Sequence, residues 1–549
     1  MPSATPAEVT TQETTPTFQV RANLVLVRVV VRDSSGNPVG TLNRDDFQLF
    51  DNHKQEIVSH FNLEKVSPPA KVAGSSANSS APGAGAAAAA KANPQRFLGL
   101  YFDDMHAVMG DLMQARTAAQ KFISTSMQPT DRTGVFTSSG EDTLDFTDDQ
   151  EKLRAAIGKI HPHAMTAPNG MDCPNIDQYT GYQIVEEHNT SILEALALDV
   201  LHCDYQDNPQ YLGQARMQVQ SRAQAAFQEG ESQALYATQT LDQLIRRMTM
   251  LPGQRSIILA SPGFLELRDP QSVWALIERA LHANVVVNSL DVRGLFVPAG
   301  SGDVSQAMTG LAETAGPEAM VRMDGDNRRA DVMRDMATGT GGLFFNNSND
   351  LNAGFCELGS VPEYSYVLGF VPENTKLDGR FHSIDVKLTQ HGKYAVQARR
   401  GYYAPAHTET AAENAHHDVE EAVFSDETFD SLPLEVHAQF FKMDDKKARI
   451  NVLAKVDTKP MPFRKKDGRN VDDLTIVTVL FDSDGKYVEG TQKTLSMNLM
   501  DATRETLSKS GIRTRATFDV GLGTYQVRMV VRDSEGSLMS THNETVEVQ

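Results

Sequence analysis

The sequence contains little cysteine, little tryptophan and no long apolar run, and each shortage excludes a class of protein. Its 549 residues include one tryptophan and three cysteines, Cys173, Cys203 and Cys356, none of which forms a CxxC motif. The spacings typical of zinc and redox sites are therefore missing. The alanine run at 86–90 is short and lacks the bulky apolar residues of a membrane-spanning helix. No transmembrane segment is predicted.

Positive charge is also scarce, since the formal net charge is −20 at pH 7. A nucleic-acid-binding protein needs a basic surface to displace counterions, so this balance argues against nucleic-acid partners. It also disfavours adsorption to anionic membranes. An acidic surface otherwise keeps a protein soluble. The partner is therefore expected to be neither a nucleic acid nor a lipid surface.

Two features bear on the cellular location. After Met1 the chain reads Pro-Ser-Ala-Thr-Pro, without the basic start and apolar core of a signal peptide. A signal peptide that has been removed leaves this picture, so we expect an extracytoplasmic protein, whether periplasmic, secreted or at the cell surface. Cys173 and Cys203 bracket one segment and are candidates for a disulfide in an oxidising compartment, the alternative being three buried thiols.

The length predicts two to four domains, because single cores stop growing near about 250–300 residues. Residues 1–17 are rich in Thr, Pro and Ala and are predicted to be disordered. Residues 18–64 contain β-branched runs that predict a β module. Residues 65–95 form a low-complexity linker of Gly, Ser and Ala.

The pattern changes at residue 96. Apolar runs at 97–102, 256–260 and 285–290 alternate with helical spacing up to about residue 360, which predicts an α/β domain with helices on both faces of a mostly parallel sheet. Asp103, Ser261 and Asp291 each follow such a run. Ligands bind beyond the carboxyl ends of parallel strands, so these side chains are expected to share one edge.

The remaining chain reads as β structure. Residues 362–404 are predicted to complete one β-sandwich with the N-terminal module, so that the α/β domain is inserted into it. Residues 405–430 form an acidic linker, and 431–549 are predicted to form an independent Ig- or fibronectin-like sandwich. The predicted fold class is thus α/β multidomain, with a Rossmann-type domain and two sandwich modules.

Several motifs in the correct order resemble the von Willebrand factor A (VWA)-related domain family described from acidobacterial proteins. The resemblance covers roughly residues 20–404 and includes the strand before Asp103 and the segments 131–140, 144–149, 288–295, 336–342 and 398–403. It implies a VWA-like fold for residues 96–360 and an exported location. It implies no ligand.

VWA domains commonly hold Mg²⁺ through an Asp-x-Ser-x-Ser motif and further oxygen ligands, which suit this hard cation. Asp103 matches the first Asp, but Met105 and Ala107 occupy the two Ser positions. Pro262 lies where the family often has Asp. The motif is therefore degenerate, and we expect no Mg²⁺ and no other cofactor.

Asp103, Asp104 and His106 suggest a different site. Two carboxylates and an imidazole suit zinc or manganese, with His161 or His163 as a further partner across the edge. In the alternative interpretation, Asp103 caps the following helix and His106 is a surface or packing residue. The sequence contains neither a Gly-x-Ser-x-Gly elbow nor a P-loop.

The insertion at 161–214 contains Cys173 and Cys203 and is expected to cover or reshape the sheet edge. Its helix, at about 184–201, is expected to pack there through Ile192, Leu193, Leu196 and Leu198.

These observations favour a non-enzymatic, adhesion-type binding protein whose partner is another protein or a surface polymer. Its binding edge would comprise Asp103, Asp104, His106, Ser261 and Asp291. The alternatives are a metal-dependent enzyme that uses Asp103, Asp104 and His106, and a structural spacer in an envelope or extracellular assembly.

Overall fold

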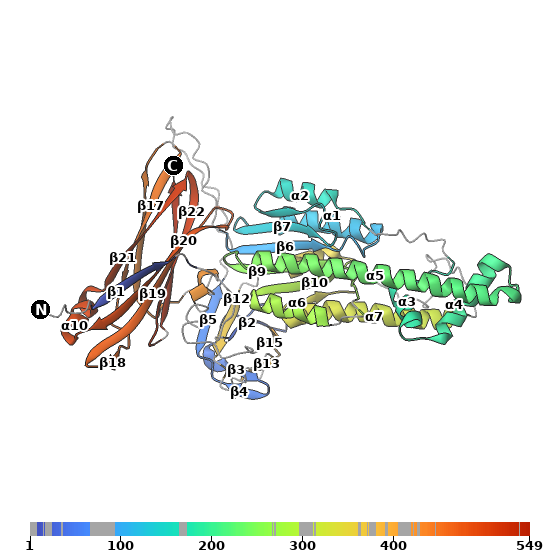
Figure 1. Ribbon diagram of the computed structural model, residues 1–549, viewed down its shortest axis with the longest axis horizontal. Coiled ribbons are helices and arrows are strands. Elements are labelled where there is room, and N and C mark those ends of the chain that lie inside the picture. Colours follow the sequence, from blue (N-terminus) through green and yellow to red (C-terminus); the bar gives the residue numbers. More distant parts are fainter. Residues whose placement is uncertain are drawn as a thin grey trace, which may run out of the picture.

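The protein is elongated, with a β-rich unit at one end, an α/β unit in the middle and a helical arm at the other end (Figure 1). The computed structural model describes residues 8–14, 16, 25–34, 37–65, 94–163, 173–265, 267, 271–295, 311, 314–360, 364–370, 372, 380–389, 393–403, 419–420, 422–424, 429–444, 446–536 and 538–548. Most of the predicted linkers at 65–95 and 405–430, and parts of the predicted disordered segment 1–17, lie outside the described residues.

The α/β unit is built on a six-stranded sheet with the order β11-β10-β9-β6-β7-β8. Its strands are β6 (Arg96–Phe102), β7 (Asp131–Thr137), β8 (Leu144–Thr147), β9 (Gln254–Ser261), β10 (Val285–Asp291) and β11 (Phe344–Phe345). Strands β6 and β7 are buried along their whole length, as expected for apolar runs in the centre of a covered sheet.

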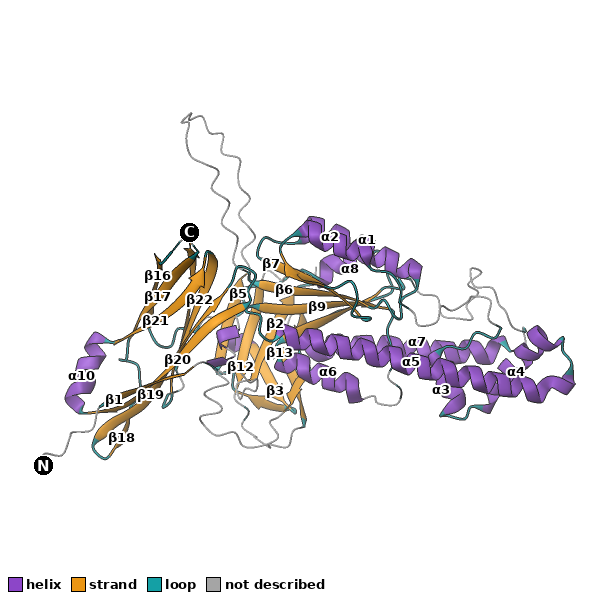
Figure 2. Cartoon of the chain, turned by 45° about the horizontal axis from the view of Figure 1, so that its top comes forward, coloured by secondary structure: helices purple, strands orange, loops and turns teal. Residues whose placement is uncertain are grey.

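Helices cover both faces of this sheet (Figure 2). One face packs against α1 (Met109–Ser126), α2 (Gln150–Lys159) and α8 (Leu351–Leu358). The other face packs against α5 (Leu212–Met248), α6 (Gln271–His282) and α7 (Ala315–Thr340). In α1, α2, α5, α6 and α8 the apolar positions recur at helical spacing, and burial of that stripe against the sheet holds these helices in place.

The predicted fold class, a mostly parallel Rossmann-type VWA-like sheet plus Ig-like modules, is wrong for this chain. Its sheets are mostly antiparallel, and among the described strands parallel pairing is confined to one sheet. That sheet is itself mixed, because β8 runs antiparallel to β7. The physical reason is that strands joined by short turns pair antiparallel, whereas parallel strands need long crossovers.

Strands from both sides of the α/β unit in the sequence form two four-stranded sheets with one core. One sheet has the order β14-β2-β12-β5 and the other β15-β13-β3-β4, with a short 3-10 helix η1 (Arg44–Asp46) before β3. Their bounds are β2 (Val25–Arg32), β3 (Phe47–Asp51), β4 (Lys54–Glu56), β5 (His60–Lys65), β12 (Tyr364–Phe370), β13 (Phe381–Leu388), β14 (Ala395–Ala398) and β15 (Gly401–Tyr403). Strand β2 lies between β12 and β14, so residues about 340 apart share one sheet.

The C-terminal unit contains a second pair of antiparallel sheets around one core. The smaller sheet comprises β16 (Leu434–Lys442), β17 (Lys447–Val456) and β21 (Ile512–Gly521). The larger comprises β1 (Val9–Thr14), β18 (Arg464–Lys466), β19 (Arg469–Phe481), β20 (Tyr487–Leu499), β22 (Gly523–Asp533) and β23 (Met539–Val548), with α10 (Asp501–Ser510) after β20. The prediction of disorder is wrong for residues 9–14, because they form edge strand β1 along β20, where backbone pairing compensates for their polar side chains.

The helical arm extends the α/β unit beyond its sheet. Helix α5 has 37 residues, which corresponds to about 55 Å. Its first half packs with α3 (Gln178–Val185), α4 (Thr190–Tyr205), the short 3-10 helix η2 (Pro209–Tyr211) and the start of α7, around a small separate core. Among the described residues, no helix is both long enough and apolar enough to cross a membrane.

The insertion reaches the sheet edge through His163, which hydrogen-bonds to Asp104 there, but the predicted placement of its helix at about 184–201 is wrong. Helix α4 packs on α5 and α7, beyond the sheet (Figure 1). Ile192 and Leu196 are buried in this contact and Leu193 is partly buried, but Leu198 is 39% exposed. The reason is that α5 carries an apolar stripe outward past the sheet, which offers α4 a partner there.

The C-terminal unit is fastened to the amino ends of the central strands. Arg255 donates to the Phe424 carbonyl (2.6 Å), and Arg528 of β22 donates to the Ala422 carbonyl (2.7 Å). Buried Arg132, at the start of β7, donates to the Ser483 carbonyl in the β19–β20 turn (2.9 Å). The carboxyl ends of these strands point the other way, toward the arm (Figure 1).

Candidate binding edge

The structure brings the sequence-predicted side chains to one edge. Asp103 directly follows β6, and Ser261 and Asp291 are the last residues of β9 and β10, where they are register partners. Strand β9 also pairs in parallel with β6, so its carboxyl end lies beside Asp103. Shared strand direction is the cause of this convergence.

Asp103 is completely buried and its carboxylate is fully hydrogen-bonded. The Ser138 and Ser261 hydroxyls donate to its two oxygens (2.9 and 2.6 Å), and His106 Nδ1 lies 2.8 Å from Oδ1. Burial alone would raise the pKa of Asp103, but the charge of His106 and these hydrogen bonds outweigh burial and lower it. Asp103 is therefore held as a carboxylate.

The capping interpretation of Asp103 needs a correction. Asp103 accepts from the His106 backbone N–H (3.2 Å), and its own carbonyl accepts from Ala107 N–H (3.1 Å). It thus closes the turn 103–107, whereas the N-cap of α1 is Val108, which has no side chain that can cap. His106 is mostly buried and pairs with Asp103 through Nδ1 (2.8 Å).

Asp104 shares the Ser138 hydroxyl with Asp103 (2.8 Å) and has further partners of its own. Its oxygens accept from the Ser139 N–H (2.9 Å), the Ser139 hydroxyl (2.6 Å) and His163 Nδ1 (2.9 Å). The other nitrogen of His163 pairs with Glu141 (2.9 Å). Burial lowers the pKa of His163, but the carboxylates of Asp104 and Glu141 outweigh it and raise that pKa. His161 is exposed and lies 3.5 Å from Asp142, and its ring is tilted against that of His163 with the centroids 4.2 Å apart.

The residues present do not fit a Mg²⁺ site at this edge. Met105 and Ala107, at the two Ser positions, are buried apolar side chains, and Ala107 belongs to the core beneath α1. Both oxygens of Asp103 are directed at hydroxyls and His106. No set of three His, Cys, Asp or Glu side chains in the described part of the chain is placed to hold a metal. Nε2 of His106 is buried without a hydrogen-bond partner among these residues, but one nitrogen is too few for a metal site.

Asp291 lies beside this cluster in a second, charged network. Arg293 forms a bidentate pair with Asp291 (3.0 and 2.7 Å) and contacts Asp326 of α7 (3.3 Å). Arg329 bridges Asp326 (3.2 Å) to Asp177 (3.0 Å) at the start of α3. Asp291, Arg293 and Asp326 line part of a hollow together with Met323.

Negative charge exceeds positive charge at this hollow. Burial and the nearby carboxylate of Asp291 raise the pKa of Asp111, on the first turn of α1. Burial also raises the pKa of Asp326, and its two arginine neighbours lower it only in part. The network thus has more carboxylates than guanidinium groups to neutralise them.

Large apolar side chains are exposed next to the edge. Val108, Met109 and Met113, on and before the first turns of α1, are 56%, 53% and 54% exposed. Leu295, which follows β10, is 57% exposed. Asp111 lies between Met109 and Met113 on α1 and interacts with Asp291 and Arg293, so this helix turn and the end of β10 are neighbours.

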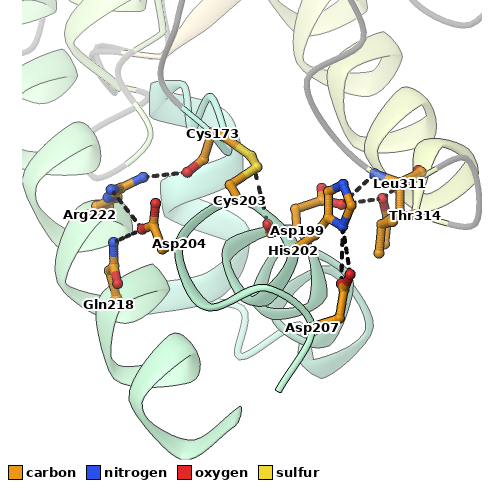
Figure 3. Close-up of a disulfide and its surroundings, with 10 residues drawn as sticks. All are labelled: Cys173, Asp199, His202, Cys203, Asp204, Asp207, Gln218, Arg222, Leu311 and Thr314. Carbon is orange, nitrogen blue, oxygen red and sulfur yellow. Dashed lines mark hydrogen bonds and ion pairs between the residues drawn. A yellow bond between two sulfur atoms is a disulfide. The ribbon is translucent and has the colours of Figure 1, made fainter. Parts of the chain in front are cut away.

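The predicted disulfide is confirmed. Cys173 and Cys203 are bonded, with their Cα atoms 6.3 Å apart, and Arg222 of α5 donates to the Cys173 carbonyl (2.8 Å; Figure 3). Cys356 is a free, half-buried thiol. A disulfide is compatible with an extracytoplasmic location.

Sequence reasoning missed several residues of the edge. Ser138 and Ser139 directly follow β7, so the rule that found Asp103 applies to them equally. Glu141 lies in the same loop. Asp326 is different, because it reaches the edge from the middle of α7, and no local pattern in the sequence marks that contact.

Comparison with known proteins adds little. No family model matches the sequence, and no curated protein matches it either. BatB from Bacteroides thetaiotaomicron is 14% identical at a TM-score of 0.22, and the match covers 48% of this chain and 96% of BatB. A DUF4785 family protein from Legionella pneumophila is 10% identical at a TM-score of 0.13, with 34% of this chain and 42% of that chain covered. Bacteroides uniformis β-glucuronidase 2 is 10% identical at 0.14, with 35% and 20% covered. Such distant neighbours assign neither a family nor an activity.

Proposed function

We propose that this chain is an exported, non-enzymatic binding protein that engages a protein partner through the carboxyl edge of its mixed sheet. One contrast supports the proposal. The carboxylates of Asp103 and Asp104 at this edge are buried and hydrogen-bonded to neighbouring side chains, whereas the apolar side chains beside them are more than half exposed, namely Val108, Met109, Met113 and Leu295.

The buried cluster is poorly suited to catalysis. A hydrolytic serine needs a base that takes its proton and access to substrate. Ser138 and Ser261 are completely buried, and both hydroxyls donate to the carboxylate of Asp103. These two hydroxyls and His106 hold Asp103 as a structural carboxylate. This arrangement disfavours a metal-dependent enzyme centred on Asp103, Asp104 and His106.

The exposed residues suit a protein partner. Several large apolar side chains exposed beside polar groups are typical of an interaction site, and methionine adapts its shape to different partners. The adjoining hollow carries excess negative charge around Asp291 and Asp326. A partner segment with a basic side chain next to large apolar ones would complement both features.

A structural spacer remains the second candidate, because the three units are arranged in a row with the C-terminal unit fastened at the opposite edge (Figures 1 and 2). In that case the ends of the molecule would carry the contacts, and the sheet edge would carry none.

The test compares three baits in pull-downs from envelope extract, each with and without EDTA. The baits are the wild type, Met109→Asp/Met113→Asp, and the control Met217→Asp, which alters a methionine of α5 that is 63% exposed. We expect the wild type and the control to retain one partner that the double variant loses, unaffected by EDTA. Equal capture by all three baits would contradict the proposed edge, and dependence on a divalent cation would revive the metal hypothesis.

A further inference from the structure

Two acidic side chains, Asp199 and Glu318, meet inside the arm, and Figure 3 shows the first of them near the disulfide. Asp199 of α4 is completely buried, and its Oδ1 accepts from the Leu311 N–H (2.8 Å) and the Thr314 hydroxyl (2.7 Å). Its Oδ2 is also buried, and no backbone N–H, hydroxyl or cationic side chain of the described residues donates to it. A buried carboxylate oxygen without a donor is costly, so a donor is expected nearby.

Glu318 supplies that donor. It lies one turn after Thr314 on α7, its side chain is only 15% exposed, and it hydrogen-bonds to Asp199. Two ionised carboxylates are both acceptors, so this bond requires a proton on one of them. Burial, together with the bond to Asp199 and the charge of Asp199, raises the pKa of Glu318 to about 7. A protonated Glu318 therefore donates to the open oxygen of Asp199.

Little positive charge surrounds the Asp199–Glu318 pair. Arg322, one turn further along α7, lies 3.3 Å from Glu318 and lowers its pKa only in part. On α4, His202 is paired with Asp207 and Asp204 with Arg222 of α5. On the α3 side, Asp177 is paired with Arg329. Among the described residues, Arg322 is thus the cation that faces Glu318.

We propose that Asp199 and Glu318 form a proton-operated latch, in which one shared proton holds the start of α7 on α4 and its loss loosens the arm. The contact lies next to the small core of the arm, where Val321 of α7 packs. When the proton is lost, two carboxylates face each other at a nearly closed site. Repulsion then favours separation of α7 from α4, while the sheet and its own core stay intact.

The direction of the pH effect follows from linkage. Glu318 holds its proton up to about pH 7 in the closed arm and up to its ordinary pKa of 4.5 in an open one. Opening therefore becomes easier as pH rises between these values and changes little above them. The open fraction should increase roughly fortyfold between pH 5 and pH 7.

Hydrogen exchange measured by mass spectrometry on the full chain tests this latch. With rates corrected for intrinsic exchange, we expect peptides from 190–205 and 315–325 to lose protection from pH 5 to pH 7. In Glu318→Gln, the amide donates to Asp199 at every pH, so protection should stay at the wild-type pH 5 level. Asp331→Asn is the matched control, because Asp331 lies on the same helix, is 62% exposed and pairs with Arg334. It should keep the wild-type profile.

A pH-independent wild type, or the same slope in Glu318→Gln, would overturn the latch. If Glu318→Gln fails to fold, the carbon-13 shifts of glutamate carboxyl groups in the wild type decide the question. One glutamate titrating near pH 7 supports the latch, and titration of all glutamates below about pH 5.5 excludes it. Neither result depends on whether the sheet edge binds a partner.

Discussion

A second buried acid makes a quantitative prediction about the C-terminal unit. Asp472 of β19 and Asp533 of β22 are 1% and 0% exposed. Both oxygens of Asp533 accept backbone N–H groups, at 2.6 Å each, and Oδ2 of Asp472 has no partner among the described residues. Burial, followed by the charge of Asp533, raises the pKa of Asp472 from 3.8 to about 6. Asp472 therefore carries a proton in the folded protein at mildly acidic pH.

The proton on Asp472 makes the stability of the folded protein depend on pH. Between pH 4 and pH 6 the folded state binds a proton that the unfolded state has lost, so stability falls as pH rises through this window. Two pKa units correspond to about 3 kcal/mol. Asp472→Asn keeps the acceptor for Asp473 N–H and Ser534 but never ionises. We expect it to match the wild type near pH 4 and to be about 3 kcal/mol more stable at pH 7.5.

Urea unfolding, followed by hydrogen exchange of the amides in β19 and β22, measures this difference in the free energy of unfolding. Tryptophan fluorescence is unsuitable, because Trp274 lies in α6 of the α/β unit. The matched control is Asp473→Asn, an exposed neighbour that should leave the pH profile unchanged. A free-energy difference between Asp472→Asn and the wild type that stays constant from pH 4 to pH 7.5 would refute the reasoning.

Three further outcomes are expected. Replacing Cys173 and Cys203 by Ala opens a link with a sequence separation of 30 and should cost the arm roughly 3.5 kcal/mol, seen as faster proteolysis of α3 and α4 with unchanged tryptophan fluorescence. Ser261→Ala removes a donor from buried Asp103 and should lower the stability of the α/β unit by about 1–3 kcal/mol in urea unfolding followed by that fluorescence. Arg132→Ala removes a hydrogen bond to the C-terminal unit and should broaden the distance distribution in small-angle X-ray scattering, whereas an unchanged distribution would mean that other contacts suffice.

The central strands and the edge could be predicted because their signals are local. The apolar runs at 97–102 and 256–260 fall within β6 and β9, and the polar residue after each run reaches the same edge. Parallel strands require that convergence whatever the rest of the chain does. The same rule would have added Ser138, had it been applied to the end of β7.

Strand direction outside this sheet cannot be predicted from local sequence in the same way. An alternating pattern shows that a strand has one buried face, but it does not show which strand lies beside it. Strand β1 illustrates the limit, because its polar residues 9–14 form a strand only through pairing with β20. The fold class was therefore misjudged where partners far apart in the sequence decide the pairing.

The arm was misplaced for a related reason. A helical pattern gives the apolar stripe of α4 but not the surface that receives it, and that surface depends on how far α5 continues past the sheet. Asp199 and Thr314 are 115 residues apart in the sequence, and their contact exists only once α4 and α7 are packed. The acid pair in the arm was thus beyond sequence reasoning.

The buried acids of this chain differ in charge because of what faces them, not because of how deeply they lie. Asp103 is completely buried, yet an imidazole and two hydroxyls lower its pKa and keep it ionised. Asp472 and Glu318 each face another carboxylate and hold a proton instead. Burial raises the pKa of an acid in every case, so the sign of the outcome rests with the neighbour. Asp103 at the sheet edge therefore keeps one charge state, whereas Glu318 in the arm and Asp472 in the C-terminal unit each lose a proton as pH rises.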